Sequence, residues 1–179
     1  LDYSIKKNIS NLADFMNKDI LSITVCVMDR PRHKKIIEEL KKLGVKIKLI
    51  TDGDVVGALY VSDPKYNVDI FLGIGGGPEG VLAASALDAY GCHFQGRFIF
   101  DNDKDINEAK QMGITDLSKK YELNEIIKGD SIFCATGITT GDILSGIDII
   151  NNNYTSETLV THKSSNYKEI VRRTNPIKE

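Results

Sequence analysis

The sequence predicts an α/β fold: a layered sandwich with a mainly parallel sheet and helices on both of its faces. Strand-like apolar runs alternate with helix-like segments along most of the 179 residues, an order typical of parallel sheets with helical crossovers. A polar or glycine-rich motif follows each of the first three expected strands, where α/β proteins bind their ligands. The length suits one hydrophobic core, so we expect a single domain over residues 1–179.

The first expected elements are a helix, a strand and a second helix. Residues 4–16 have apolar side chains at helical spacing, and residues 21–28 form a β-branched run that favours a strand. Residues 31–43 are predicted to be helical because Pro31 stands at the start of the segment and Gly44 follows its end.

Two further strands and two further helices follow in the same order. Residues 45–50 and 68–72 are apolar runs of strand length. Residues 55–60 predict a short helix, and residues 81–90, rich in alanine and leucine, predict a longer one. The glycine-rich loop 73–80 connects the third strand to this longer helix.

The second half of the chain is less regular, and its apolar runs are shorter. We expect strands at 97–100, 131–135, 158–160 and 168–172, and helices near 105–112 and 121–127.

Composition excludes several classes of partner. The net charge of −2 gives no overall attraction to nucleic acid or to a membrane surface, so any anion site must be local. No apolar run reaches membrane-spanning length and no signal peptide is recognisable, which favours a cytoplasmic protein. The cysteines Cys26, Cys92 and Cys134 lack zinc-site spacing, and we expect Cys26 and Cys134 to be reduced core residues.

The glycine-rich loop carries the strongest candidate for chemistry. Small residues from Gly73 to Gly80 let backbone amides approach an anionic ligand, and Pro78 marks the start of a helix. Glu79 adds a carboxylate, which suggests a divalent cation that bridges the protein and a phosphate. The alternative is a first-turn glutamate that is favoured by the helix dipole alone.

A basic motif follows the first expected strand. The guanidinium groups of Arg30 and Arg32, on either side of Pro31, form a candidate phosphate clamp because arginine presents paired donors to phosphate oxygens. The alternative is a solvated basic helix start, and the segment alone favours neither interpretation.

An acidic motif follows the second expected strand. Asp52 and Asp54, on either side of Gly53, can chelate a metal or accept hydrogen bonds from sugar hydroxyls. Standing alone, the motif favours a simpler interpretation in which Asp54 caps the helix that follows.

Two other groups of residues are weaker candidates. Residues 135–142 contain glycines and hydroxyls that favour a turn, with Asp142 capping or supporting the site from behind. His33, His93 and His162 lack catalytic spacing and are expected at the surface or as satisfied core residues.

The order of the motifs adds to their individual weight. Neighbouring parallel strands would bring the basic, acidic and glycine-rich motifs to one edge of the sheet. A pocket with guanidinium groups, carboxylates and amides suits a phosphorylated sugar together with a metal ion.

The same motifs carry a family resemblance over essentially the whole chain. MDRPRH, LITDGDV, GIGGGPEGVLAA and ATGIT.GD, followed by ETL and VRR, resemble the class II fructose-1,6-bisphosphatases. The resemblance implies the fold of inositol monophosphatase and related sugar phosphatases. It also implies hydrolysis of the 1-phosphate of fructose 1,6-bisphosphate with magnesium or manganese, a step of gluconeogenesis, and for some members the use of sedoheptulose 1,7-bisphosphate.

The resemblance also assigns roles to individual residues. The family's substrate-contacting basic run falls on Arg30, Pro31 and Arg32, and its sugar-contacting acidic run falls on Asp52, Gly53 and Asp54. Its substrate-contacting glycine falls on Gly76 and its metal-ligating glutamate on Glu79. Arg30 departs from the family, in which lysine is common at that position.

The match covers only the carboxyl-terminal, sugar-binding part of such an enzyme. We expect the amino-terminal half, with the other metal ligands and the catalytic groups, to be absent and the chain to be inactive without it. Full-length members are expected to be homo-oligomers. Two alternatives are a phosphosugar-binding module without turnover and, less favoured, a dinucleotide-dependent oxidoreductase, because the glycine loop follows the third strand rather than the first.

Overall fold

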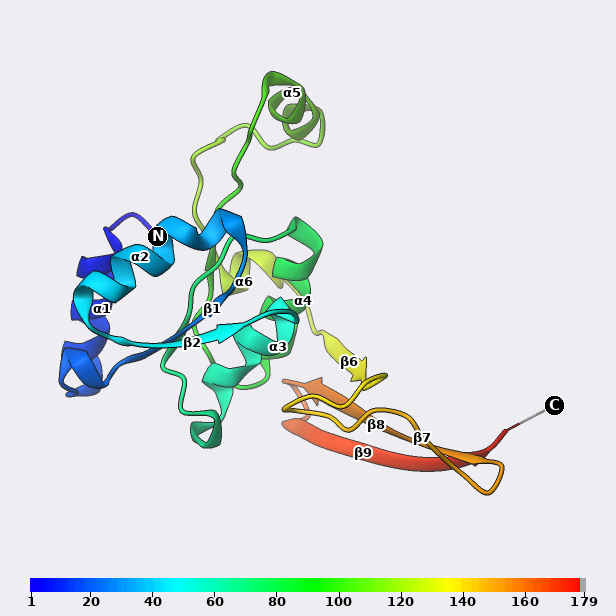
Figure 1. Cartoon of the computed structure of the whole chain (residues 1–179). Coiled ribbons are helices and arrows are strands. Elements are labelled where there is room, and N and C mark those ends of the chain that lie inside the picture. Colours follow the sequence, from blue (N-terminus) through cyan, green and yellow to red (C-terminus); the bar gives the residue numbers. More distant parts are fainter. Residues whose placement is uncertain (178–179) are drawn as a thin grey trace.

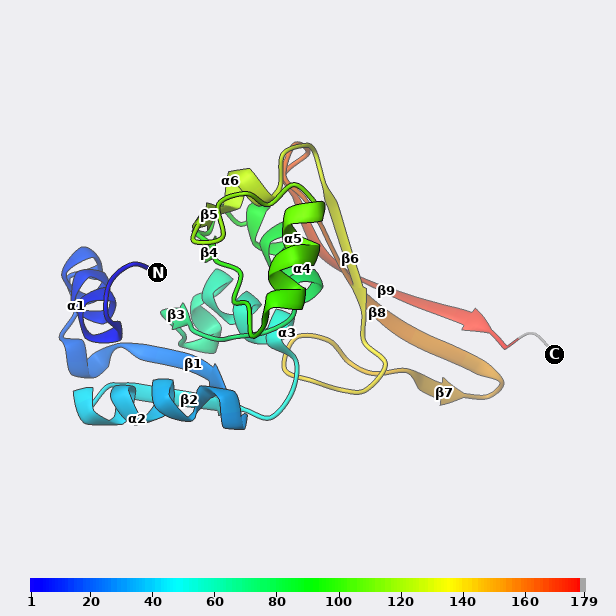
Figure 2. The same cartoon turned by 90° about the horizontal axis from the view of Figure 1, so that it is seen from above.

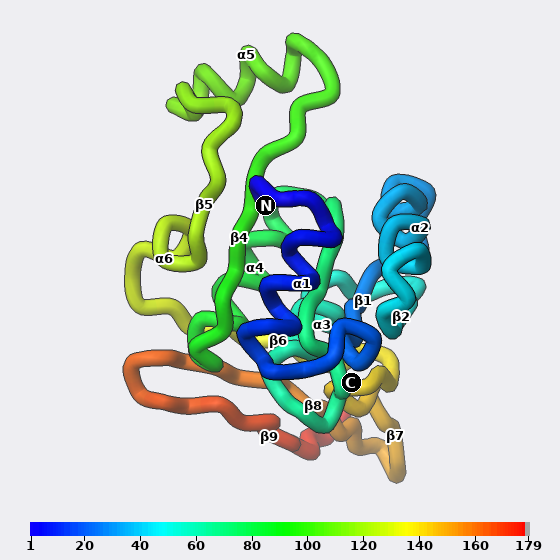
Figure 3. The backbone as a smooth tube through the Cα atoms, turned by 90° about the vertical axis from the view of Figure 1, so that its left-hand side faces the viewer, coloured from blue at the N-terminus to red at the C-terminus, as the bar shows by residue number. Residues whose placement is uncertain are grey.

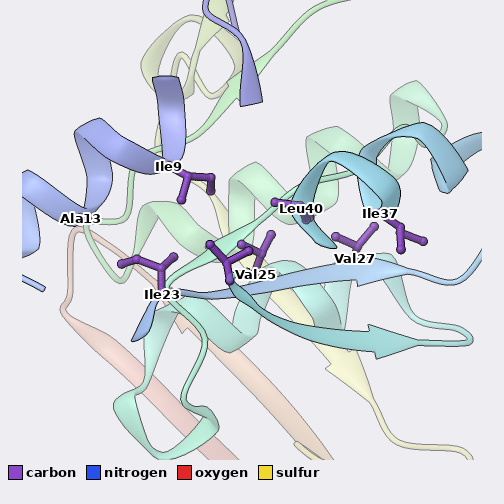
Figure 4. Close-up of a cluster of buried hydrophobic side chains, with 8 residues drawn as sticks. Ile9, Ala13, Ile23, Val25, Val27, Ile37 and Leu40 are labelled. Carbon is purple, nitrogen blue, oxygen red and sulfur yellow. The ribbon is translucent and has the colours of Figure 1, made fainter. Parts of the chain in front are cut away.

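A computed structural model describes residues 1–177 and places them in two larger sheets and a small two-stranded one, with helices between and beside the larger sheets (Figure 1). The chain begins with helix α1 (Ile5–Met16), which starts where the hydroxyl of Ser4 accepts a hydrogen bond from the amide of Lys7. The expected first helix is therefore confirmed. Its buried side chains, Ile9 and Ala13, face the first sheet (Figure 4).

The first sheet is parallel and contains β1 (Thr24–Met28), β2 (Lys46–Ile50) and β3 (Ile70–Phe71) in the order β2-β1-β3. Strand β1 is central, and four of its five residues are buried. Side chains alternate across a strand, so burial of successive residues means that both faces of the sheet are covered. This confirms the predicted α/β class with a parallel sheet.

Different helices cover the two faces. On one face, Val25 and Val27 pack with residues of α1 and α2 (Lys34–Leu43), as Figure 4 shows. On the other face, Cys26 packs with Tyr60, just after helix α3 (Asp54–Leu59). The expected strand at 21–28 begins later than predicted because residues Ile20–Ser22 form a 3-10 turn, η1.

The second sheet is antiparallel and lies on the far side of α3 and α4 (Gly77–Asp88), as Figure 2 shows. Ala58 of α3, Ala86 of α4 and Phe133 of the second sheet belong to one buried cluster. From one side of the molecule to the other, the layers are therefore helices α1 and α2, the parallel sheet, helices α3 and α4, and the antiparallel sheet. The strands of the antiparallel sheet are β6 (Ile132–Thr136), β7 (Asp148–Ile150), β8 (Asn153–His162) and β9 (Tyr167–Pro176).

This second sheet was only partly expected. The short strands predicted at 158–160 and 168–172 lie within two ten-residue strands paired along their whole length, and β7 was not predicted. Cys134 was expected in the core, but it is exposed because it occupies the outer face of β6, opposite the buried Phe133.

The middle of the chain departs most from expectation. The strand predicted at 97–100 is wrong: Phe98 instead stacks on Phe100 and meets the edge of Tyr121, so aromatic packing explains the apolar pattern. Helix α5 (Asp103–Gln111) projects from the body in Figures 1 and 3. The other short elements of this region are β4 (Gln95–Gly96), β5 (Tyr121–Glu122) and α6 (Leu123–Ile126).

The remaining 3-10 turns lie earlier in the chain. They are η2 (Pro31–His33), η3 (Tyr60–Ser62) and η4 (Pro64–Tyr66).

Within residues 1–177, every helix is too short or too polar to cross a bilayer.

Candidate functional site

The three motifs that follow β1, β2 and β3 meet at one edge of the parallel sheet. The basic motif is central, since β1 lies between β2 and β3. Arg30 lies 3.8 Å from the carboxylate of Asp52, and Arg32 donates a hydrogen bond of 2.5 Å from Nε to the carbonyl oxygen of Ile74. The predicted juxtaposition is therefore present in the structure, while the role of each residue stays a prediction.

The basic motif has a local geometry that leaves its donors at the surface. Arg30 is extended, and Pro31 begins the 3-10 turn η2 rather than the α-helix that the sequence predicts from this point. Arg30 and Arg32 are both exposed. The bond to Ile74 uses only Nε of Arg32, so the terminal nitrogens, which form paired bonds to phosphate, are not consumed by it.

The acidic motif is not a helix cap. Gly53 occupies the N-cap position of α3 with φ +80°, a conformation that favours glycine, and Asp54 is the first helical residue. Asp54 accepts a hydrogen bond of 2.9 Å from the amide of Val55, and Asp52 accepts one of 2.9 Å from Gly53. The simpler interpretation of Asp54 as the cap is wrong. Asp52 has a side chain that is 94% exposed, so its carboxylate is accessible to a ligand.

The glycine-rich loop brings its carboxylate back over its own backbone. Gly76 is the N-cap of α4, and Glu79 lies in the first turn. A Cβ at Gly76 would collide with the carboxylate of Glu79, so a larger residue here would displace that carboxylate. A Cβ at Gly75 would lie 3.3 Å from the carboxylate of Asp54, which places the acidic motif beside the loop. Two acidic groups, from the first turns of α3 and α4, therefore border the same loop.

The described residues do not form a complete metal centre. Among residues 1–177, no three or more His, Cys, Asp or Glu side chains gather closely enough to hold a metal ion. Glu79 provides one exposed carboxylate at the edge of the sheet. Magnesium accepts one or two carboxylates when water and phosphate oxygens complete its shell, so Glu79 fits a contributing ligand but not a full site.

Of the segment 135–142, predicted as a turn, residues 135 and 136 belong to β6, and the rest is a loop with bends that leads towards β7 within the antiparallel sheet. Asp142 accepts hydrogen bonds from the hydroxyl of Tyr60 at 2.8 Å and from Nζ of Lys48 at 3.3 Å. The Tyr60 bond and then Lys48 lower the pKa of Asp142, and burial raises the pKa of Tyr60. Asp142 thus contacts β2 through Lys48 and the turn after α3 through Tyr60, while its supporting role at the site stays a prediction.

The three histidines are surface or satisfied core residues, as expected, and one of them also contacts the glycine-rich loop. His93 is exposed, and His162 bonds to Asp130 and Ser165 at the turn between β8 and β9. His33 is fully buried with both ring nitrogens bonded to backbone, which makes it a satisfied core residue. One of the backbone partners of His33 is Ile74, which lies inside the glycine-rich loop.

The antiparallel sheet carries a separate polar cleft. Glu157 of β8 accepts a hydrogen bond of 2.8 Å from the amide of Ser145, which fixes the turn that forms one wall. The motifs ETL and VRR contribute Glu157 and Arg172 to the cleft, and neither residue is among those that gather at the parallel sheet. The cleft is lined by Thr140, Ser145, Gly146, Ile147, Asp148, Thr155, Glu157 and Arg172.

Comparison with known proteins identifies the family to which this arrangement corresponds. Residues 1–175 match the family model described as bacterial fructose-1,6-bisphosphatase, glpX-encoded. The chain belongs to this family. The resemblance predicted from the motifs is confirmed, and the fold of the family accounts for the parallel sheet with its helices.

Curated relatives of this fructose-1,6-bisphosphatase family carry one shared name, D-fructose 1,6-bisphosphatase class 2/sedoheptulose 1,7-bisphosphatase. A protein of a Synechococcus species (strain JA-2-3B'a(2-13)) is 37% identical over 178 residues, covering 92% of this chain and 51% of the relative. One from Trichodesmium erythraeum is 34% identical, with coverage of 92% and 52%. One from Synechocystis is 33% identical over 184 residues, with coverage of 96% and 53%. The chain thus spans about half the length of the curated relatives it matches.

Proposed function

We propose that the chain binds a sugar bisphosphate at the carboxyl edge of its parallel sheet and takes part in metal-dependent hydrolysis of fructose 1,6-bisphosphate to fructose 6-phosphate. The observation that supports this most is the meeting of two exposed arginines, two aspartates and the loop of Glu79 at one edge. Family membership supports the substrate class.

In this proposal the two ends of the substrate meet different motifs. The guanidinium groups of Arg30 and Arg32 bind the phosphate that does not react, through paired charge-assisted hydrogen bonds. Asp52 and Asp54 accept hydrogen bonds from the sugar hydroxyls, and Gly76 leaves room beside the reacting phosphate. Binding at the remote end then orients the reacting end, which lowers the barrier to hydrolysis.

The metal of the proposed reaction is Mg²⁺ or Mn²⁺, and Glu79 is the residue of this chain that would hold it. Such an ion neutralises charge on the phosphoryl oxygens and activates water. Because Glu79 alone does not complete a site among residues 1–177, we expect the 179-residue chain by itself to bind the bisphosphate without turning it over. Phosphate release with either metal, at a rate comparable to that of a full-length relative, would contradict this.

Calorimetric titration of the chain tests the binding step separately from turnover. We expect fructose 1,6-bisphosphate to bind more tightly than fructose 1-phosphate, which lacks the phosphate that does not react, by about tenfold or more, since one charge-assisted phosphate contact contributes roughly 1.5–3 kcal/mol. Equal affinity for the two sugars would contradict a distal phosphate clamp. NADH serves as the control ligand, and its binding would instead favour the oxidoreductase alternative.

Sedoheptulose 1,7-bisphosphate is a second candidate substrate, favoured by the names of the relatives and by the open position of Asp52. A titration under the same conditions should give an affinity within about 200-fold of that for fructose 1,6-bisphosphate, because a difference of one carbon changes contact energy by roughly 1–3 kcal/mol at most. Failure to bind the seven-carbon sugar would restrict the proposal to fructose 1,6-bisphosphate.

A further inference from the structure

His33 lies between the end of β1 and the glycine-rich loop, with no solvent exposure. Its Nδ1 is 2.8 Å from the carbonyl oxygen of Met28, the last residue of β1. Its Nε2 is 2.8 Å from the amide nitrogen of Ile74 and 3.0 Å from the carbonyl oxygen of the same residue. One buried ring therefore contacts the backbone of two segments that are far apart in sequence.

These partners determine the tautomer of the ring. A carbonyl oxygen only accepts, so Nδ1 must carry the hydrogen that is donated to Met28. The amide of Ile74 only donates, so Nε2 must be the acceptor and carry no hydrogen. The carbonyl oxygen of Ile74 is already bonded by Nε of Arg32 at 2.5 Å. Every polar group around the ring is thus satisfied by a neutral His33.

The bond between His33 and Ile74 connects the segment after β1 to the loop after β3, beyond the point where these two strands stop pairing. Strand β3 pairs with β1 at only two residues, Ile70 and Phe71, and the amide of Leu72 adds one bond to Cys26. From there the loop diverges from β1, and Arg32 and His33 provide the next hydrogen bonds between the two segments, both at Ile74. Gly76 and Glu79 follow within one turn.

We propose that His33 is a positioning residue that fixes the glycine-rich loop relative to Arg30 and Arg32. Its catalytic consequence rests on the proposed function: the loop carries Glu79 to the reacting phosphate, while the arginines hold the other. Loss of the bond from Ile74 to His33 leaves the loop held at this residue by Arg32 alone, so the loop moves more freely while both arginines are kept. The expected result is a fall in kcat with little change in KM.

Two substitutions separate the two bonds of the ring. In His33→Gln the side-chain oxygen reaches the position of Nε2 and accepts from Ile74, whereas in His33→Asn the amide reaches only the position of Nδ1 and donates to Met28. Both variants lose the ring and its packing. A role limited to packing therefore predicts the same behaviour for both, and a positioning role predicts that only His33→Asn releases the loop.

Hydrogen exchange of the 179-residue chain measures this release without any assumption about activity. We expect the amide of Ile74 to exchange about tenfold faster in His33→Asn than in His33→Gln, the change that corresponds to one lost hydrogen bond. Equal exchange in the two variants overturns the proposal. If neither variant folds, the ring of the wild-type protein decides: long-range ¹H–¹⁵N spectra must show a hydrogen on Nδ1 and none on Nε2, and the opposite tautomer overturns it.

The catalytic consequence is tested by the equivalent pair of substitutions in an active full-length relative. We expect kcat to fall at least tenfold more in the asparagine variant than in the glutamine variant, with KM unchanged within about threefold. Equal kcat values combined with unequal exchange would overturn the positioning role and leave the bond itself intact. Failure of the chain to bind a sugar bisphosphate would instead contradict the proposed function, whatever the exchange result.

Discussion

The parallel and antiparallel sheets of this chain place their polar side chains in different ways. In the parallel sheet the interior of β1 is apolar and buried, and the polar groups stand just after the strands, at one edge. In the antiparallel sheet, polar residues lie within β8 and β9 themselves, where only Leu159 and Thr161 are buried. A parallel sheet therefore concentrates ligand-binding groups from distant sequence positions, whereas the antiparallel sheet distributes them over its surface.

The two sheets also differ in what holds them in place. The parallel sheet has short strands and is covered by helices on both faces. The antiparallel sheet has a ten-pair ladder between β8 and β9 and packs on α4 through one face only. The first depends on side-chain packing, and the second depends more on its backbone ladder. Comparing matched residues from the two sheets tests this distinction.

The largest effect is expected at the face that joins the antiparallel sheet to α4. Phe133→Ala should lower the free energy of unfolding by about 3–5 kcal/mol, because this side chain is 6% exposed and packs with Ala86 and Leu87. Its neighbour Ile132 is 67% exposed on the opposite face, so Ile132→Ala should change stability by less than about 1 kcal/mol. Urea unfolding measures both, and equal losses would show that both faces of β6 are covered in solution.

Part of this organisation could be predicted from the sequence and part could not. Strand β1 was predicted because burial on both faces makes it a continuous apolar run. Strand β7 was missed because its three residues are all exposed and its length is below that of a recognisable pattern. The strand predicted at 97–100 was wrong because Phe98 and Ile99 are apolar yet exposed, and Phe98 stacks on another ring.

The candidate site, too, could be predicted only in part from the sequence. The gathering of the three motifs followed from the order of strands, since parallel neighbours end at one edge. The contact of His33 with Ile74 could not be predicted, because residues 41 positions apart meet only after the sheet has formed. The sequence identified a histidine beside two arginines, but not the backbone groups that its ring would contact.

The next largest effect is expected when one carboxylate is removed from each sheet in a full-length relative. The equivalent of Glu79→Gln should reduce kcat on the order of a hundredfold or more, because a metal contributes several kcal/mol to phosphoryl transfer. The equivalent of Glu157→Gln removes a carboxylate that bonds the amide of Ser145 in the antiparallel sheet, and should leave kcat within about twofold. Activity of the first variant within twofold of wild type at saturating manganese would rule out the ligand role.

A smaller effect is expected from a matched pair of exposed arginines. Arg32→Ala in this chain should weaken binding of fructose 1,6-bisphosphate by roughly 1.5–3 kcal/mol, the contribution of a hydrogen bond to a charged group. Arg172→Ala removes an arginine from the polar cleft of the antiparallel sheet and should leave the affinity unchanged. Titration calorimetry measures both. Equal weakening by the two variants would mean that the phosphate is attracted by general charge rather than by the basic motif.

The smallest effect concerns Asp142, where a loop of the antiparallel sheet meets β2 and η3 of the other region. Its bonds to Tyr60 and Lys48 hold the pKa of Asp142 below its ordinary value in the folded protein. A carboxyl group with a lowered folded pKa stabilises the protein above its unfolded pKa of about 3.9, and the contribution is lost as pH falls through the folded pKa.

We therefore expect wild type to lose stability relative to Asp142→Asn as pH falls below about 4, with little further change between pH 5 and 7. The difference should stay below about 1 kcal/mol because the side chain is 57% exposed and solvent screens the ion pair. Urea unfolding at several pH values measures it, with Asp148→Asn, a carboxylate of β7 outside this contact, as the control. The same pH dependence in both variants would mean that Asp142 does not join the two regions in solution.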